Sequence, residues 1–183
     1  MDDAEGFMPA FFYDDVTIGS IQKVGDYQVS EEEILEFGRK WDPLPIHVDI
    51  EAAKRSPFGG LTAPGSLILA IKQKLVHDLP LRQSVVCSLG FDKVRFRAPL
   101  RPGDRVYAEV TWLSKRLSES QPGCGIVDLG IALRNTRDEA IVEHTDTILI
   151  RLRAGPPNGA AIDHAPVHDA AQDMALRGGP GCL

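Results

Sequence analysis

An aspartate and a histidine five residues apart are the side chains of this sequence best suited to acid–base chemistry. Asp42 and His47 lie on either side of Pro43 and Pro45, in the segment 41–49. Proline fixes its own backbone φ and restricts the residue before it, so the segment should hold the two groups in one geometry. A carboxylate and an imidazole held in this way can share one water molecule, one taking its proton while the other delivers a proton to a substrate.

The same pair has an ordinary structural interpretation. An Asp before a Pro commonly ends a helix, and a His beside a loop is often a surface residue. Taken alone, Asp42 and His47 therefore leave both interpretations open, and the elements around them must decide.

The chain before the pair is predicted to contain a strand and a helix. Residues 19–28 can form an extended entry strand. Ser30 is a good N-cap and Glu33 follows three residues later, so a helix is expected to begin here and to end at the two prolines. The apolar face of this helix comprises Ile34, Leu35, Phe37 and Trp41. After the pair, residues 51–55 should form a helical turn that ends at the loop 56–60.

A second helix is predicted to start at Gly65 and to enter the core. The segment 65–79 is apolar at nearly every position for two turns, and Leu67, Ile68, Ile71 and Leu75 recur at helical spacing. Four long strand-like runs follow, over residues 85–97, 105–117, 126–135 and 140–153. Each strand needs its apolar face covered, and only this helix is apolar enough all round to cover it. The sequence therefore predicts an α+β fold with one helix packed along a curved antiparallel sheet.

Composition excludes several classes of function. The net charge is −6, from 20 basic and 26 acidic residues, so no broad positive field exists to hold a nucleic acid. The N-terminal segment carries acids where a signal peptide needs basic residues, and no apolar run approaches the ~20 residues of a membrane-spanning helix. Three cysteines form no disulfide framework. We expect a cytoplasmic protein with no membrane or nucleic-acid partner.

The last thirty residues are predicted to form a flexible tail. Residues 154–183 contain seven Ala, five Gly and four Pro, too few large apolar side chains to offset the entropy of ordering. Asp163, His164, His168 and Asp169 have the right types for metal ligands, but Pro166 interrupts the helix that would align the histidines. No metal site is expected.

Several motifs in the same order resemble the MaoC-like dehydratase family. Asp42, Pro45, Ile46 and His47 match the family's hydratase signature of Asp, any residue, Asn, Pro, an aliphatic residue and His. Further landmarks of the family resemble segments 51–53, 56–60, 63–65, 89–92 and 99–104. The likeness spans about residues 19–153 and favours the catalytic interpretation of the pair. It implies one domain, residues 1–153, folded as a single hotdog with a curved antiparallel sheet wrapped around a long central helix.

The resemblance also implies a reaction. Members add water reversibly and in the syn sense to a trans-2-enoyl thioester, giving an (R)-3-hydroxyacyl product, with no metal or redox cofactor. Asp42 would orient or deprotonate the water and His47 would share it and handle the second proton. The acyl group would be carried by coenzyme A or by acyl carrier protein. Leu44 stands where the signature has Asn, which leaves the substrate open.

Other predicted site residues surround the start of the central helix. The first amides of a helix have no partner within it and carry the positive end of its dipole, so Gly65 and Ser66 are expected to stabilise the enolate oxygen. Plain helix-to-sheet packing would also explain Gly65. Further substrate contacts are expected from Phe58, Gly60 and Pro64, the last of which has no amide hydrogen to give. Contacts to coenzyme A phosphates could come from Lys93, Arg95, Arg97 and Arg101, although a solvated strand face is the more common explanation of such a basic run.

Three alternative functions remain from the residues. A hotdog also supports thioesterases and non-catalytic acyl-binding subunits. A thioesterase usually needs a carboxylate on or facing the central helix, and residues 65–76 contain no Asp or Glu. A pure interaction module would explain none of the ordered motifs. Because a single hotdog leaves strand edges open, we also expect a homodimer.

Overall fold

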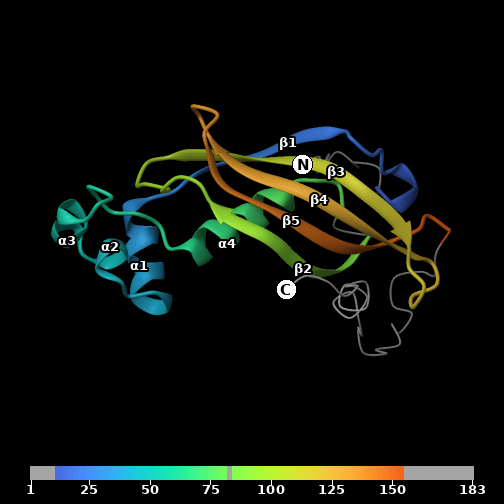
Figure 1. Cartoon of the computed structure of the whole chain (residues 1–183), viewed down its shortest axis with the longest axis horizontal. Helices are drawn as coiled ribbons and strands as arrows, with labels where there is room; N and C mark the ends of the chain where they lie inside the picture. The colour runs from blue at the N-terminus through green and yellow to red at the C-terminus, as the bar shows by residue number, and fades with distance from the viewer. Residues whose placement is uncertain (1–10, 82–83, 155–183) are drawn as a thin grey trace, which may run out of the picture.

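A five-stranded antiparallel sheet curves along one central helix in the computed structural model, whose described residues are 11–81 and 84–154 (Figure 1). The helices are η1 (Tyr13–Asp15), α1 (Glu31–Trp41), α2 (Pro45–Val48), α3 (Ile50–Arg55) and α4 (Gly65–Val76). The strands are β1 (Ile21–Gln28), β2 (Val85–Phe96), β3 (Arg105–Leu117), β4 (Cys124–Asn135) and β5 (Ala140–Arg151), in the order β1-β3-β4-β5-β2 across the sheet. This is the hotdog architecture, and the prediction of an α+β fold is confirmed.

The core lies between α4 and the concave face of the sheet. All four residues of the predicted helical stripe are buried, with exposed fractions of 2–3%. From β3, the alternating residues Val106, Ala108, Val110 and Trp112 are buried as predicted, because successive side chains of a strand point to opposite faces. One buried residue was not predicted: Lys72 of α4 has no exposed surface.

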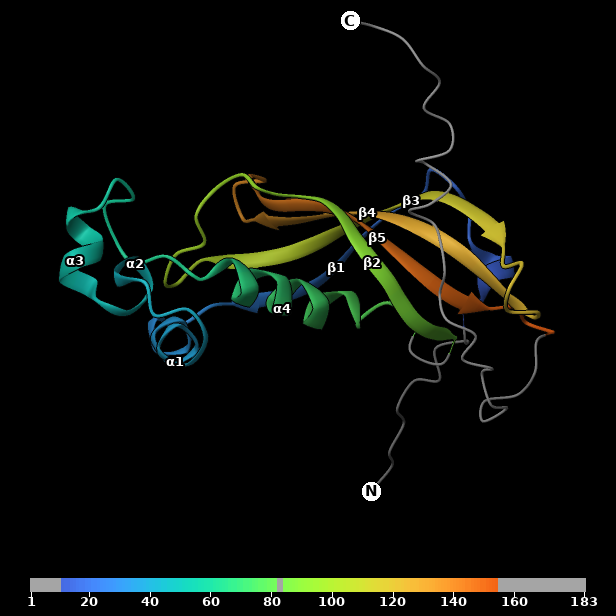
Figure 2. The same ribbon diagram turned by 60° about the horizontal axis from the view of Figure 1, so that its bottom comes forward.

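Helices α1, α2 and α3 gather at one end of the molecule, beside the start of α4 (Figures 1 and 2). The Ser30 side chain accepts a hydrogen bond from the Glu33 amide at 3.0 Å, which confirms the predicted N-cap. Ile34 is fully buried, but Trp41 is 65% exposed, so its assignment to the apolar face was wrong. Trp41 is the last residue of the helix, after which the chain departs towards Pro45, and Lys40 stacks on its ring instead.

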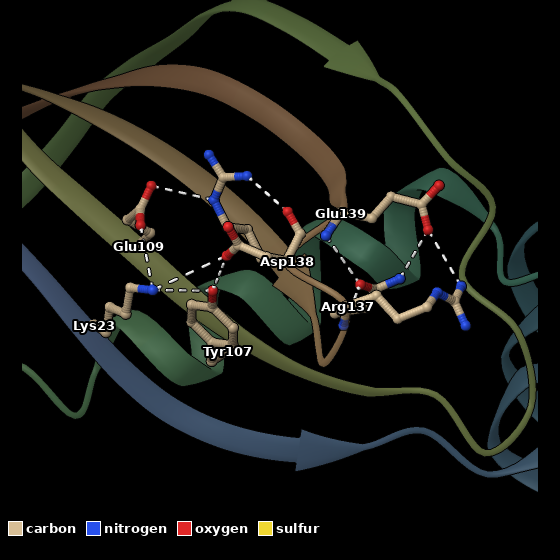
Figure 3. Close-up of polar contacts among 8 residues, drawn as sticks. Lys23, Tyr107, Glu109, Arg137, Asp138 and Glu139 are labelled. Atoms are coloured by element: carbon tan, nitrogen blue, oxygen red, sulfur yellow. Dashed lines mark hydrogen bonds and ion pairs between the residues drawn. The ribbon is translucent and has the colours of Figure 1, made fainter.

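The convex face of the sheet carries a polar network that joins neighbouring strands (Figure 3). Lys23 of β1 donates to the Tyr107 hydroxyl of β3 at 3.3 Å, and Tyr107 donates to Asp138 in the turn before β5. The hydrogen bond from Tyr107 holds the pKa of Asp138 below its usual value. This face is therefore polar and suited to contact with water.

Strands β1 and β2 form the two edges of the sheet. Among the described residues, strand β2 pairs only with β5, and its register shifts at several points along its length. The tail assigned to residues 154–183 and its four metal-ligand types lie outside the described residues, apart from Ala154. Within the described ranges, no helix has the length and apolar character needed to cross a bilayer.

Candidate active site

Asp42 and His47 come together at the junction of α1 and α2. Asp42 is the C-cap of α1, and His47 lies in the short helix that Pro45 begins. Their nearest atoms, Asp42 Oδ2 and His47 Nε2, are 3.7 Å apart. His47 is therefore in a helical turn rather than in a loop, because proline at the first helical position already has the required φ. The separation is too long for a direct hydrogen bond but brings both groups within reach of one small molecule.

The imidazole of His47 is held in one orientation. Its Nδ1 donates to the carbonyl oxygen of Thr62 at 2.7 Å. Because a carbonyl can only accept, Nδ1 carries a hydrogen, and Nε2 is the ring nitrogen that faces Asp42. His47 is only 6% exposed, whereas the Asp42 side chain is 35% exposed. The pair thus combines a buried, oriented base with a partly solvated carboxylate.

Backbone hydrogen bonds around Thr62 connect this segment to α2 and to the segment that follows β2. The Thr62 amide donates to the Ile46 carbonyl at 3.1 Å, and the Ala63 amide donates to the Leu100 carbonyl at 2.8 Å. The sequence analysis did not identify Thr62. Its role depends on a backbone carbonyl fifteen residues from the histidine, which no local pattern reveals.

Gly38 allows α1 and α2 to approach each other closely. A Cβ at this position would lie 2.9 Å from the His47 carbonyl oxygen and 3.0 Å from Val48 Cγ1. Real Cβ atoms essentially never lie as close as 2.9 Å to another heavy atom, and this one is backbone, so any side chain here would displace the turn that carries His47. A glycine inside an otherwise helical pattern is the sequence signal for such a contact.

A cavity of about 380 Å³ lies beside the imidazole. His47 and Thr62 form part of its wall, and Gly65 and Ile68 bring the first turns of α4 to it. The remaining lining is mainly apolar: Ile46, Phe58, Ala63, Phe96, Ala98 and Pro99, with Arg97. A mostly apolar pocket with a few convergent polar groups is the usual form of a small-molecule site. The structure thus brings four predicted residues, His47, Phe58, Gly65 and Arg97, to one cavity.

Gly65 opens α4, and its lack of a side chain has a packing reason. A Cβ here would lie 2.8 Å from Cζ of the Phe96 ring, so the ring, which is 51% exposed, would have to shift to admit a side chain. The same absence leaves the cavity open to the helix terminus, where the first amides have no acceptor within the helix. Pro64 is the buried N-cap, with its carbonyl accepting from Ile68 at 3.1 Å, and Ser66 is exposed. Neither Pro64 nor Ser66 is among the residues that line the cavity.

Arg101 holds the loop 56–60 in place by a hydrogen bond to its backbone. The guanidinium of Arg101 donates to the Phe58 carbonyl at 2.6 Å and lies against Gly60, where a Cβ would be 3.3 Å from Nη1. Gly60 itself does not line the cavity. Arg101 is thus engaged with the loop that presents Phe58.

The other basic residues have different surroundings. Arg97 lines the cavity and donates from Nε to Glu143 at 2.8 Å. Arg95 donates to the carbonyl of its neighbour Val94 at 2.8 Å, and Lys93 has a positive φ of 55° in an irregular part of β2. The basic run therefore does not act as one patch, and Arg97 is its one member at the cavity wall. Leu44 is 52% exposed and also lies outside the lining.

A second polar group lies under the sheet, along α4. Lys72 Nζ lies 3.8 Å from Asp146 Oδ2 of β5, and Asp146 Oδ1 accepts from Ser88 of β2 at 2.9 Å. Burial raises the pKa of Asp146 and lowers that of Lys72. Asp146 was not identified from the sequence, because only residues 65–76 of the helix itself were considered and Asp146 faces the helix from the sheet.

Known proteins resemble this chain in fold and in sequence. A family model described as a MaoC like domain matches residues 17–133. The crystal structure of a MaoC-like dehydratase from Rhodospirillum rubrum superposes with a TM-score of 0.74 at 32% identity, covering 79% of this chain and 99% of that one. The Bacillus subtilis protein YdeM is 27% identical over 139 residues, or 75% of this chain and 97% of its own length.

A relative that has a named activity matches a smaller part of this chain. The 3-hydroxyacyl-thioester dehydratase Z of Mycobacterium tuberculosis is 35% identical over 100 residues, which cover 51% of this chain and 66% of that protein. The family model covers more than half of the chain, and the Rhodospirillum structure covers 79% of it. This chain therefore belongs to the MaoC-like family of hydratases and dehydratases.

Proposed function

We propose that the protein is an acyl-thioester hydratase or dehydratase that adds water reversibly to a trans-2-enoyl thioester, giving an (R)-3-hydroxyacyl thioester. The observation that carries the proposal is the common cavity of His47 and the first turn of α4, with Asp42 Oδ2 3.7 Å from the imidazole. A base and a helix terminus on one cavity are the two parts that this reaction needs.

Asp42 and His47 would act on the same water. Nε2 of His47 presents a lone pair that can accept a proton, because Nδ1 donates to Thr62. Asp42 would orient the water, and the proton that Nε2 of His47 takes from it would then be delivered to the α-carbon, so that both side chains end in the protonation state in which they began. His47 lines the cavity and Asp42 does not. Because the same imidazole would receive the proton of the attacking water and deliver it to the α-carbon, oxygen and proton would reach the same face of the double bond, which is syn addition.

The enolate oxygen that forms during addition would meet the amides of Gly65 and its helical neighbours. The positive end of the helix dipole favours a negative oxygen there. A donor of this kind accounts for roughly 3 kcal/mol of barrier lowering in enzymes that use one. The carrier would be coenzyme A or acyl carrier protein, with Arg97 as the basic group nearest the cavity for its phosphates.

The deciding experiment follows the absorbance of the conjugated enoyl thioester with crotonyl-CoA and with longer enoyl-CoAs. Loss of absorbance without release of free thiol is the expected result, and chiral analysis should identify the (R) product. No loss of absorbance with any chain length, on coenzyme A or acyl carrier protein, would contradict the proposal.

A second candidate, thioester hydrolysis, has one observation in its favour. Asp146 faces α4 from β5, where a thioesterase would need a carboxylate. However, Asp146 is paired with Lys72 and Ser88, and it is absent from the lining of the cavity that contains His47. Free thiol appearing in the same assay would identify this reaction.

A further inference from the structure

A second cavity of about 400 Å³ lies at the far end of α4. Its walls are mainly apolar and include Val76, Leu129 and Ile148, while Ser88 and Asp146 provide polar atoms. Neither Asp42 nor His47 belongs to it. The acid–base pair therefore does not account for this space.

One stripe of α4 has residues at both cavities. Ile68 lines the first and Val76 lines the second. Lys72 stands between them, four residues from each, and side chains at this spacing lie on one face of a helix. The rise of 1.5 Å per residue separates Ile68 from Val76 by about 12 Å.

The facing strand repeats this order. Phe96, which lines the first cavity, pairs with Val142 of β5. Asp146 and Ile148 of the same strand line the second. His144 lies between them on the same face, because alternate residues of a strand share a face. Lys72 on the helix and His144 on the sheet thus lie between the residues that line the two cavities, although neither lines a cavity itself.

The charged members of this group have partners. Lys72 Nζ donates to Gln73 at 3.0 Å, lies 3.8 Å from Asp146 and stands 4.3 Å from the Phe91 ring centroid. Asp146 also accepts from Ser88 at 2.9 Å. The lysine and the carboxylate offset each other's charge, so the group has no unbalanced charge to hold an ion.

His144 is the exception. It is 5% exposed, and within the described ranges neither ring nitrogen has a hydrogen-bond partner; its neighbour Phe91 contacts it edge to face. A buried polar group without a partner is costly, and a role in function is one of the reasons that such a group is kept. Burial and the charge of Lys72 lower the pKa of His144 to about 4, so at neutral pH the ring has one donor and one acceptor. A hydroxyl group, which also donates and accepts, is its natural complement.

We propose that the acyl chain of the substrate runs along the Ile68–Lys72–Val76 stripe into the second cavity and carries a hydroxyl group where it passes His144 and Asp146. The inference rests on the proposed function for the identity of the ligand as an acyl thioester. A plain hydrocarbon chain would leave the imidazole unpaired, whereas a hydroxyl can accept from His144 and donate to the carboxylate of Asp146. The enzyme would thus select hydroxylated chains over plain ones.

The test measures binding without turnover. S-(2-oxoalkyl)-CoA thioethers, which are neither hydrated nor hydrolysed at the thioester position, are prepared with a plain chain and with one hydroxyl at successive carbons. Calorimetry with the full-length protein should find one hydroxyl position that binds at least tenfold more tightly than the plain chain. His144→Phe should abolish this preference while leaving the dissociation constant of the plain chain within a few-fold of wild type. Thr145→Val, a change on the opposite face of β5, should retain the preference.

Two results would overturn the proposal: no hydroxylated chain binds the wild-type protein better than the plain chain, or His144→Phe keeps the full preference. If His144→Phe does not fold, NMR of the wild-type protein replaces it, and the ring-nitrogen signals of His144 should respond to the hydroxylated ligand and not to the plain one. A free aliphatic diol that binds equally well and is not displaced by the plain thioether would place the hydroxyl site off the acyl path and refute it. Hydroxyl preference without enoyl hydration would refute the proposed reaction alone.

Discussion

Replacing Gly38 with alanine should damage the dyad although it improves the helix. Alanine is favoured over glycine inside a helix by roughly 1 kcal/mol. Here, however, its Cβ would lie 2.9 Å from the His47 carbonyl and 3.0 Å from Val48 Cγ1, so α2 must shift by several tenths of an ångström. Overpacking of this kind costs about 1–3 kcal/mol, and the net loss of stability should be about 0–2 kcal/mol. Because catalysis is sensitive to small misplacements, kcat should fall by about tenfold to a hundredfold.

The assay combines urea unfolding with enoyl-CoA hydration kinetics. Glu36→Ala is the matched control, since Glu36 is exposed on the same helix and should leave both unfolding free energy and kcat nearly unchanged. A Gly38→Ala protein that is about 1 kcal/mol more stable and fully active would show that α1 and α2 are not constrained as described.

The remaining predictions concern the dyad, the C-terminal segment, the oligomeric state and the pH dependence of stability. Asp42→Asn and His47→Ala should each lower turnover by at least about a hundredfold with unchanged circular dichroism, because the pair acts in chemistry more than in the core; near-normal activity in either folded variant would exclude its role. Deleting residues 154–183 should leave melting temperature and activity nearly unchanged, since little apolar surface is lost, and a drop of many degrees would show that the segment packs on the body. Light scattering should give about twice the 20.0 kDa chain mass, because pairing covers exposed strand edges; a fully active monomer would contradict this. Finally, the pKa of His144 falls from 6.5 to about 4 on folding. Between these two pH values the unfolded chain binds a proton that the folded chain does not bind. The free energy of unfolding should therefore decrease as the pH falls from 6.5 towards 4. His144 should account for about 2 kcal/mol of the unfolding free energy lost between pH 7 and pH 5. Urea unfolding of the wild type and of His144→Phe at both pH values measures this difference. An equal pH dependence in both proteins would refute the lowered pKa of His144.

The architecture was predictable because its determinants are local. Alternation of apolar residues over 105–112 and the helical spacing of Leu67, Ile68, Ile71 and Leu75 require no knowledge of the rest of the chain. The N-cap at Ser30 is equally local, since cap and capped amide are three residues apart. Trp41 was misassigned because spacing alone does not reveal that the chain leaves the core at that turn, where the side chain is 65% exposed.

The proximity of Asp42 and His47 follows from the sequence itself, because five residues with two prolines leave little freedom. The tertiary structure decided the rest of the site. The carbonyl that orients His47 belongs to Thr62, and the carboxylate that faces Lys72 belongs to Asp146 on β5. Lys72 lies in a run, Lys-Gln-Lys, that by composition belongs to a solvated face, yet it is fully buried. Backbone propensity and apolar periodicity act over a few residues, whereas burial and pairing of polar groups depend on which segments the folded chain brings together.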